Sequence, residues 1–146
     1  MINQDDEKFM RLALKEAQEA MRRDEVPVGA VIVAGGRVIA RGYNLTKTLT
    51  DVTAHAEMQA ITSAATYLGG KYLVDCTLYV TVEPCLMCAG ALGWSHISRI
   101  VYGCDDPKRG YHTFCDSPFH KNTVVDSGVL AQECAALMQD FFKKKR

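Results

Sequence analysis

The sequence predicts an α/β layer sandwich in which at least part of the sheet is parallel. Three observations support this fold class: an amphipathic first segment, a hairpin signal at Gly35-Gly36, and an alternation of strand-like and helix-like segments after that hairpin. Strands joined through a helix pair in parallel, because the helical crossover returns the chain to the same edge of the sheet. No repeat, low-complexity stretch or linker interrupts the sequence, so we expect one domain over residues 1–146.

The first half of the chain is predicted to form a helix, a β-hairpin and a second helix. Apolar side chains in residues 9–21 recur at helical spacing opposite a charged face, which is typical of an amphipathic helix. Residues 28–34 and 37–41 are strand-like and flank the two glycines, so we expect a two-residue hairpin turn. A polar loop follows, and a second helix is expected over about residues 54–68, where a further glycine pair ends it.

The second half is predicted to add three strands, two helices and a long loop. Pro84 suits the first turn of a helix, where its missing N–H costs no hydrogen bond. Residues 103–122 are too many for an ordinary connection and form a candidate functional loop. The other expected elements are strands at residues 77–82, 99–102 and 124–125 and a final helix at residues 130–142.

Composition narrows the class of protein. The chain has 17 Lys and Arg against 17 Asp and Glu, so net charge neither indicates nor excludes a nucleic-acid partner. The acidic start, residues 1–7, lacks the apolar segment of a secretory signal. The best apolar stretch, residues 26–34, is too short to span a bilayer. We therefore expect a soluble, cytoplasmic protein that does not engage a membrane.

The cysteines are not expected to form a disulfide framework. All six are irregularly spaced, in a chain that is large enough to bury a hydrophobic core. Cys76 and Cys134 lie among apolar residues and are expected to fill the core. Cys85 and Cys88 are expected to bind metal.

Two short motifs carry the candidate chemistry, H-A-E at residues 55–57 and P-C-L-M-C at residues 84–88. His55, Cys85 and Cys88 are strong zinc ligands, and three protein ligands leave the fourth position of a tetrahedral Zn²⁺ open for water. The two cysteines are three residues apart on one helix face, near a helix N-terminus that favours thiolate. Glu57 remains to move protons. The motifs thus predict one catalytic zinc ion per subunit.

Other sites share parts of this pattern. A C-x-x-C motif alone also occurs in redox dithiols and structural zinc modules, and H-x-E alone is usually helix surface. A closed structural site would need a fourth ligand, and a non-catalytic nucleic-acid-binding module would not need Glu57. The joint motif, each half at a helix start, is a signature of zinc nucleobase deaminases. The nominal fourth ligands are Cys104, His112, Cys115 and His120, whose spacing matches no compact zinc module.

Nearly the whole chain resembles the bacterial tRNA-specific adenosine deaminases (TadA group) of the cytidine deaminase-like superfamily. The string E-P-C-L-M-C-A-G-A is the most particular part of this resemblance. The resemblance implies a three-layer α/β/α sandwich with a mixed central sheet. It also implies a homodimeric enzyme that converts adenosine to inosine at the anticodon wobble position of tRNA. The similar segments are residues 26–33, 53–57, 77–91, 99–103 and 133–137.

The same resemblance implies a role for each site residue. His55, Cys85 and Cys88 would bind zinc, Glu57 would carry protons, and Asn44 would hydrogen-bond the bound base. From the sequence alone, Asn44 could equally be a turn residue, because asparagine is favoured in turns.

Trp94 departs from the group, which usually has a histidine there. Trp94 could stack on a nucleotide or fill the core. The helix around it, residues 86–94, is apolar nearly all round, which predicts burial against the sheet and against either a second subunit or another helix.

Two further features leave the substrate open. The loop beyond residue 110 is less similar to the group, so a deaminase of free guanine, cytosine or cytidine, with a smaller pocket, is the alternative. The basic end, residues 143–146, could bind phosphate or form a solvated tail.

Overall fold

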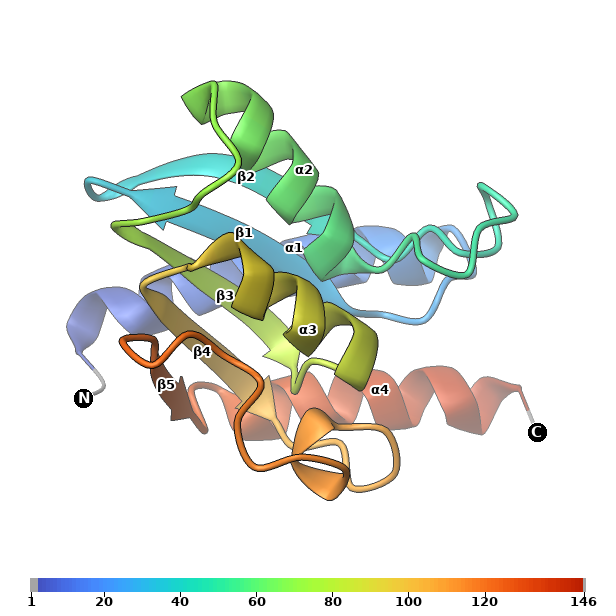
Figure 1. The fold of residues 1–146 in the computed structure, drawn as a ribbon. Helices are drawn as coiled ribbons and strands as arrows, with labels where there is room; N and C mark the ends of the chain where they lie inside the picture. Colours follow the sequence, from blue (N-terminus) through green and yellow to red (C-terminus); the bar gives the residue numbers. More distant parts are fainter. Residues whose placement is uncertain (1–2, 146) are drawn as a thin grey trace.

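A five-stranded mixed sheet with helices on both faces forms the protein (Figure 1). The strand order is β2-β1-β3-β4-β5; β1 runs antiparallel to β2 and β3, and β4 runs parallel to β3 and β5. The computed structural model describes residues 3–145, and the predicted sandwich is confirmed there. The elements are α1 (Gln4–Arg22), β1 (Gly29–Ala34), β2 (Arg37–Tyr43), α2 (Ala56–Leu68), β3 (Cys76–Val82), α3 (Leu86–Ser95), β4 (Arg99–Cys104), β5 (Val124–Ser127) and α4 (Ala131–Lys144).

The hairpin forms where the glycine pair predicts it. Gly35 and Gly36 both have positive φ, 57° and 76°, as a type I′ turn between twisted strands requires. Successive side chains of β1 point to opposite faces of the sheet. Ile32 packs on the α2 and α3 side, whereas Val31 packs on the α1 and α4 side. The central sheet is therefore buried on both faces.

Two hydrophobic cores separate the layers. Cys76 lies in the core beneath α2 and α3, and Cys134 lies in the core between the sheet and the α1–α4 pair. Both thiols are buried, which confirms their predicted role as small core residues. None of the helices within residues 3–145 has the length and apolar character that crossing a bilayer requires.

A buried ionic network ties the first helix to the sheet. Asp6 accepts two hydrogen bonds from the Arg99 guanidinium, at 2.7 and 2.8 Å, and one from the Tyr79 hydroxyl at 2.7 Å. Burial alone would raise the pKa of Asp6, but the hydrogen bonds from Arg99, Asn3 and Tyr79 outweigh it and lower the pKa to about 2. Asn3 and Asp6 also form a capping box, so α1 begins earlier than its apolar periodicity predicts.

Two sequence expectations around α3 are corrected. Pro84 is not in the first helical turn, because Cys85 after it is still extended and is the N-cap residue. Cys85 is kept extended by an antiparallel bridge to Gly110, and the Pro84 carbonyl accepts the N–H of Tyr111. Trp94 does not fill the core: it is 83% exposed, so no other helix of the described chain covers that face of α3.

Candidate active site

The N-termini of α2 and α3 bring the predicted zinc ligands together. His55 is the N-cap residue of α2, and Cys85 is the N-cap residue of α3, three residues beyond the end of β3. Neither side chain caps its own helix, so the imidazole and the thiol remain available as ligands. Cys88 lies buried in the first turn of α3. Two helix starts on the same face of the sheet therefore meet at one point (Figure 1).

The three ligand atoms have the spacing of a tetrahedral zinc site. Nδ1 of His55 lies 3.6 Å from Sγ of Cys85 and 3.5 Å from Sγ of Cys88. Zinc bonds of about 2.3 Å to sulfur and about 2.0 Å to nitrogen place such ligands roughly 3.5 Å apart at the tetrahedral angle. The residues present therefore fit zinc.

No side chain of the described residues provides a fourth ligand. Within residues 3–145, only His55, Cys85 and Cys88 form a cluster of three or more potential metal ligands. The loop cysteines and histidines named as nominal fourth ligands lie outside it. The arrangement is thus that of a catalytic site with an open position, not of a closed structural site.

The protonation of the two thiols also suits a metal. A hydrogen bond from Cys88 is the largest factor that lowers the pKa of Cys85, to about 4, with a further contribution from His55. The same hydrogen bond and burial raise the pKa of Cys88. The hydrogen bond to Cys85 raises the pKa of His55. The three side chains thus lie within hydrogen-bonding distance of one another, and a divalent cation would take the place of the shared hydrogens, because it binds thiolates and neutral imidazole.

Glu57 lies beside this cluster but does not belong to it. The side chain is only 4% exposed in the first turn of α2. Burial is the main cause that raises the pKa of Glu57, to about 7. A carboxyl group that titrates near neutral pH can both accept and donate a proton there.

Asn44 is buried and directly follows the end of β2. It lines the same cavity as His55 and Glu57. The Asn44 amide nitrogen donates to Glu25 Oε1 at 3.3 Å and to Thr46 Oγ1 at 3.4 Å. These two contacts fix the orientation of the amide.

Sequence reasoning missed the role of Glu25. Its buried carboxylate also accepts the backbone N–H groups of Lys47 and Thr48, at 3.1 and 2.6 Å. No spacing rule connects a glutamate with amides more than twenty residues away, so the sequence offered no signal.

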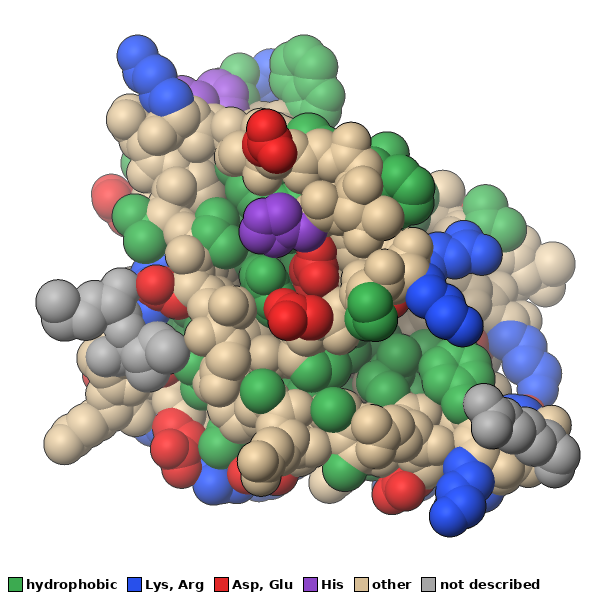
Figure 2. All heavy atoms as spheres, turned by 90° about the horizontal axis from the view of Figure 1, so that it is seen from below, with side chains coloured by type: hydrophobic (Ala, Val, Ile, Leu, Met, Phe, Trp, Pro, Cys, Tyr) green, Lys and Arg blue, Asp and Glu red, His purple; other side chains and the backbone are tan. Residues whose placement is uncertain are grey.

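The site lies in a cavity of about 1370 Å³. This volume exceeds the roughly 300–1,000 Å³ of pockets that enclose small ligands. The aromatic rings of Phe114 and Phe142 and the cationic side chains of Lys108, Arg109 and Lys143 line it as well. Seen from below, the molecule has a hollow where hydrophobic side chains gather, with Lys and Arg side chains on its right (Figure 2).

The basic end of the chain divides between two environments. Lys143 lines the cavity, whereas Lys145 forms an ion pair with Asp24. Arg146 lies outside the described residues. Residues 143–145 are all exposed, as both a solvated segment and a phosphate-binding segment require.

Comparisons with known proteins agree with this geometry. Residues 3–104 match the family model described as the cytidine and deoxycytidylate deaminase zinc-binding region. The chain is 48% identical over 143 residues to the tRNA-specific adenosine deaminase of Agrobacterium fabrum, covering 94% of each chain.

Solved structures share the fold. One comes from a study of A-to-I editing by tRNA:A34 deaminases at the wobble position of transfer RNA. It is 47% identical in sequence to this protein, with a TM-score of 0.83, and the match covers 89% of this chain and 98% of that one. Another is the guanine deaminase of Bacillus subtilis, with 40% identity and a TM-score of 0.65, over 71% of this chain and 66% of that one.

Proposed function

The chain belongs to the cytidine and deoxycytidylate deaminase zinc-binding family, and on this basis we propose that it is a hydrolase that converts adenosine to inosine at the wobble position of a tRNA anticodon. The convergence of His55, Cys85 and Cys88 as three ligands beside a buried glutamate supports the deamination chemistry. The similarity to enzymes that act on tRNA, together with the wide cavity, supports the choice of substrate. We further propose that residues 1–146 act as one domain, in the cytoplasm, where bacterial tRNA is found.

The reaction adds water at C6 of adenine and releases ammonia. When bound, the zinc ion supplies the acidity that makes water a nucleophile near neutral pH. In our proposal, Glu57 takes a proton from that water and delivers it to N1 of the adenine ring. Glu57 then takes the second proton, from the hydroxyl that is now on C6, and delivers it to the amine. The bond from C6 to nitrogen breaks, a carbonyl remains at C6, and ammonia leaves. The raised pKa of Glu57 suits a group that must change protonation state twice per turnover.

Asn44 is proposed to bind the base. Both hydrogens of its amide nitrogen are directed to Glu25 and Thr46, so its amide oxygen is the atom that can accept a hydrogen bond from the substrate. The wobble base lies in a loop of the anticodon arm, so little pairing is lost when the base enters the cavity. The outer lysines and arginine can bind phosphate, and the exposed rings can stack on neighbouring bases.

A tRNA with adenosine at the wobble position tests the substrate directly. Inosine is expected in this tRNA and not in a matched tRNA with guanosine at the same position, and ammonia should be released in equal amount. Free guanine, cytosine and cytidine serve as the competing substrates. Ammonia from one of these and none from the tRNA would show that the protein is a deaminase of a free base or nucleoside.

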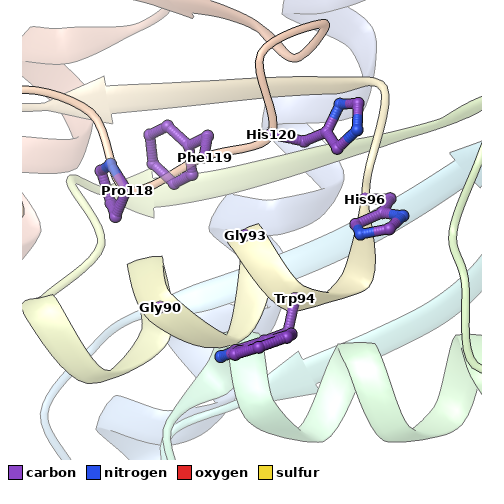
Figure 3. Close-up of a pocket in the computed structure, with 7 residues that line it drawn as sticks. All are labelled: Gly90, Gly93, Trp94, His96, Pro118, Phe119 and His120. Atoms are coloured by element: carbon purple, nitrogen blue, oxygen red, sulfur yellow. The ribbon is translucent and has the colours of Figure 1, made fainter.

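We also propose that the protein is a homodimer that associates through α3. Leu86, Met87 and Trp94 are exposed on one side of this helix, although its other side is buried in the core. Trp94 projects away from Pro118 and Phe119 (Figure 3). An exposed apolar helix face of this kind is typical of an interaction surface.

Sedimentation should therefore give twice the chain mass of 16.1 kDa at micromolar concentration. Trp94→Asp should shift the protein toward the monomer, since it places a charge on the apolar face. Val124→Asp, at another exposed apolar residue on strand β5, should leave the mass unchanged. A strict monomer for the unaltered protein would refute the dimer.

A further inference from the structure

Glu83 is a buried carboxylate that the reaction does not use. It lies in the short segment between the end of β3 and Pro84, and only 6% of it is exposed. Each of its oxygens accepts one backbone N–H from the loop that follows β4. Oε1 accepts from Asp106 and Oε2 accepts from His112, both at 3.0 Å. One side chain therefore holds both ends of a seven-residue stretch of that loop.

The backbone at Gly110 packs directly against the Glu83 carboxylate. Gly110 lies so close that a Cβ atom on it would collide with the Glu83 carboxylate, although the φ of −60° at Gly110 suits any residue. The bridge between Gly110 and Cys85 and the hydrogen bond from Tyr111 N–H to the Pro84 carbonyl, at 2.9 Å, lie alongside it. The close approach, not the backbone conformation, therefore requires glycine.

The loop that is held in this way forms one wall of the cavity. Asp106 Oδ1 accepts the backbone N–H groups of Lys108 and Arg109, at 3.1 and 3.0 Å, which fixes the turn at the tip. Lys108 and Arg109 are exposed and line the cavity, whereas Gly110 and Tyr111 at the base are buried. The loop is thus anchored at its base and presents two cationic side chains at its tip.

We infer that Glu83 is a positioning residue for substrate binding, which clamps residues 106–112 so that Lys108 and Arg109 face the RNA phosphates. The inference rests on the proposed function for the nature of the substrate. Only a carboxylate fits this role, because it offers two acceptor oxygens and no donor. Glutamine would place an N–H group against the N–H of Asp106 or His112. An unclamped loop must be ordered when RNA binds, which weakens binding without changing the reacting groups.

Two variants test the clamp from opposite sides. Glu83→Gln removes one acceptor, and Gly110→Ala displaces the carboxylate with a methyl group. With an anticodon stem-loop RNA, each should raise KM by about tenfold, the factor for one lost hydrogen bond to a charged group. The kcat value and the zinc content should stay close to those of the unaltered protein. The double variant should be no worse than the weaker-binding single variant, since both changes disturb the same contact.

Gly70→Ala is the matched control, because a Cβ there meets no atom within 4 Å and Gly70 is exposed. Its KM should not change. An unchanged KM in both test variants, or effects that multiply in the double variant, would refute the clamp. So would a loss of zinc or of kcat alone, which would assign Glu83 to support of the metal site.

Amide hydrogen exchange separates this inference from the proposed function. The N–H groups of Asp106 and His112 should be protected in the unaltered protein and should exchange faster in both variants, without any substrate. Equal exchange in all three proteins would overturn the clamp. A protein that does not deaminate tRNA but shows this pattern would refute the proposed function while the clamp stands.

Discussion

Glu57→Gln should retain its zinc and lose about a thousandfold in kcat, in the range expected for a lost general acid and base. Glutamine has nearly the same shape as glutamate, so the buried site next to Cys88 should keep its packing. An amide cannot take the proton of water or return it to the base. The three ligand side chains are unchanged, so the metal should stay. The measurements are kcat on tRNA with adenosine at the wobble position and zinc content of the purified variant.

Asn44→Ala is the matched control for this prediction. It removes a proposed contact to the base but leaves the proton carrier intact, so KM should rise while much of kcat remains. Substantial turnover by Glu57→Gln would contradict the role of Glu57 as the proton carrier. Loss of zinc from that variant would instead make Glu57 part of the metal site. An unchanged KM in Asn44→Ala would remove Asn44 from the binding of the base.

Cys88→Ser should lose both zinc and turnover. Serine is close in size to cysteine, but its hydroxyl is not a thiolate ligand, so only His55 and Cys85 would remain. Zinc that binds only the folded protein stabilises it by about 4 kcal/mol when its concentration is a thousand times Kd. Chelation should therefore lower the Tm of the unaltered protein. It should leave the Tm of Cys88→Ser unchanged, since that variant has no zinc to lose.

Cys134→Ala controls for the loss of a buried thiol as such. Cys134 lies on the buried side of α4, in the core against β4 and outside the metal cluster. This variant should unfold at a lower temperature because of the smaller side chain, but it should keep zinc and kcat. Retention of zinc by Cys88→Ser would contradict the ligand set. Loss of zinc from Cys134→Ala would mean that zinc content reports general instability.

The metal cluster and the sheet could be predicted because their signals are local. The glycine pair fixes a hairpin within two residues, and the spacing of Cys85 and Cys88 within one helical turn reports a shared face. The start of α3 could not be predicted from Pro84, because it depends on Gly110, which pairs with Cys85 across 25 residues of chain.

The two anchoring carboxylates escaped prediction for the same reason. Glu25 and Glu83 bind backbone N–H groups that are 22 to 29 residues away in sequence. Backbone amides are present at almost every residue, so no pattern of side chains marks the ones that such a carboxylate will meet. Only the folded chain reveals these contacts.

The anchoring of loops by these two carboxylates affects which substitutions the protein can accept during evolution. Glu25 and Glu83 each hold the backbone of a loop that lines the cavity, and the two hydrogen bonds at Glu83 involve no side chain of Lys108 or Arg109. Substitutions at Lys108 or Arg109 therefore alter what the loop offers to a nucleic acid while the loop itself stays in place. Substrate preference can diverge among descendants, or be re-engineered, without a matching loss of the fold or of the metal.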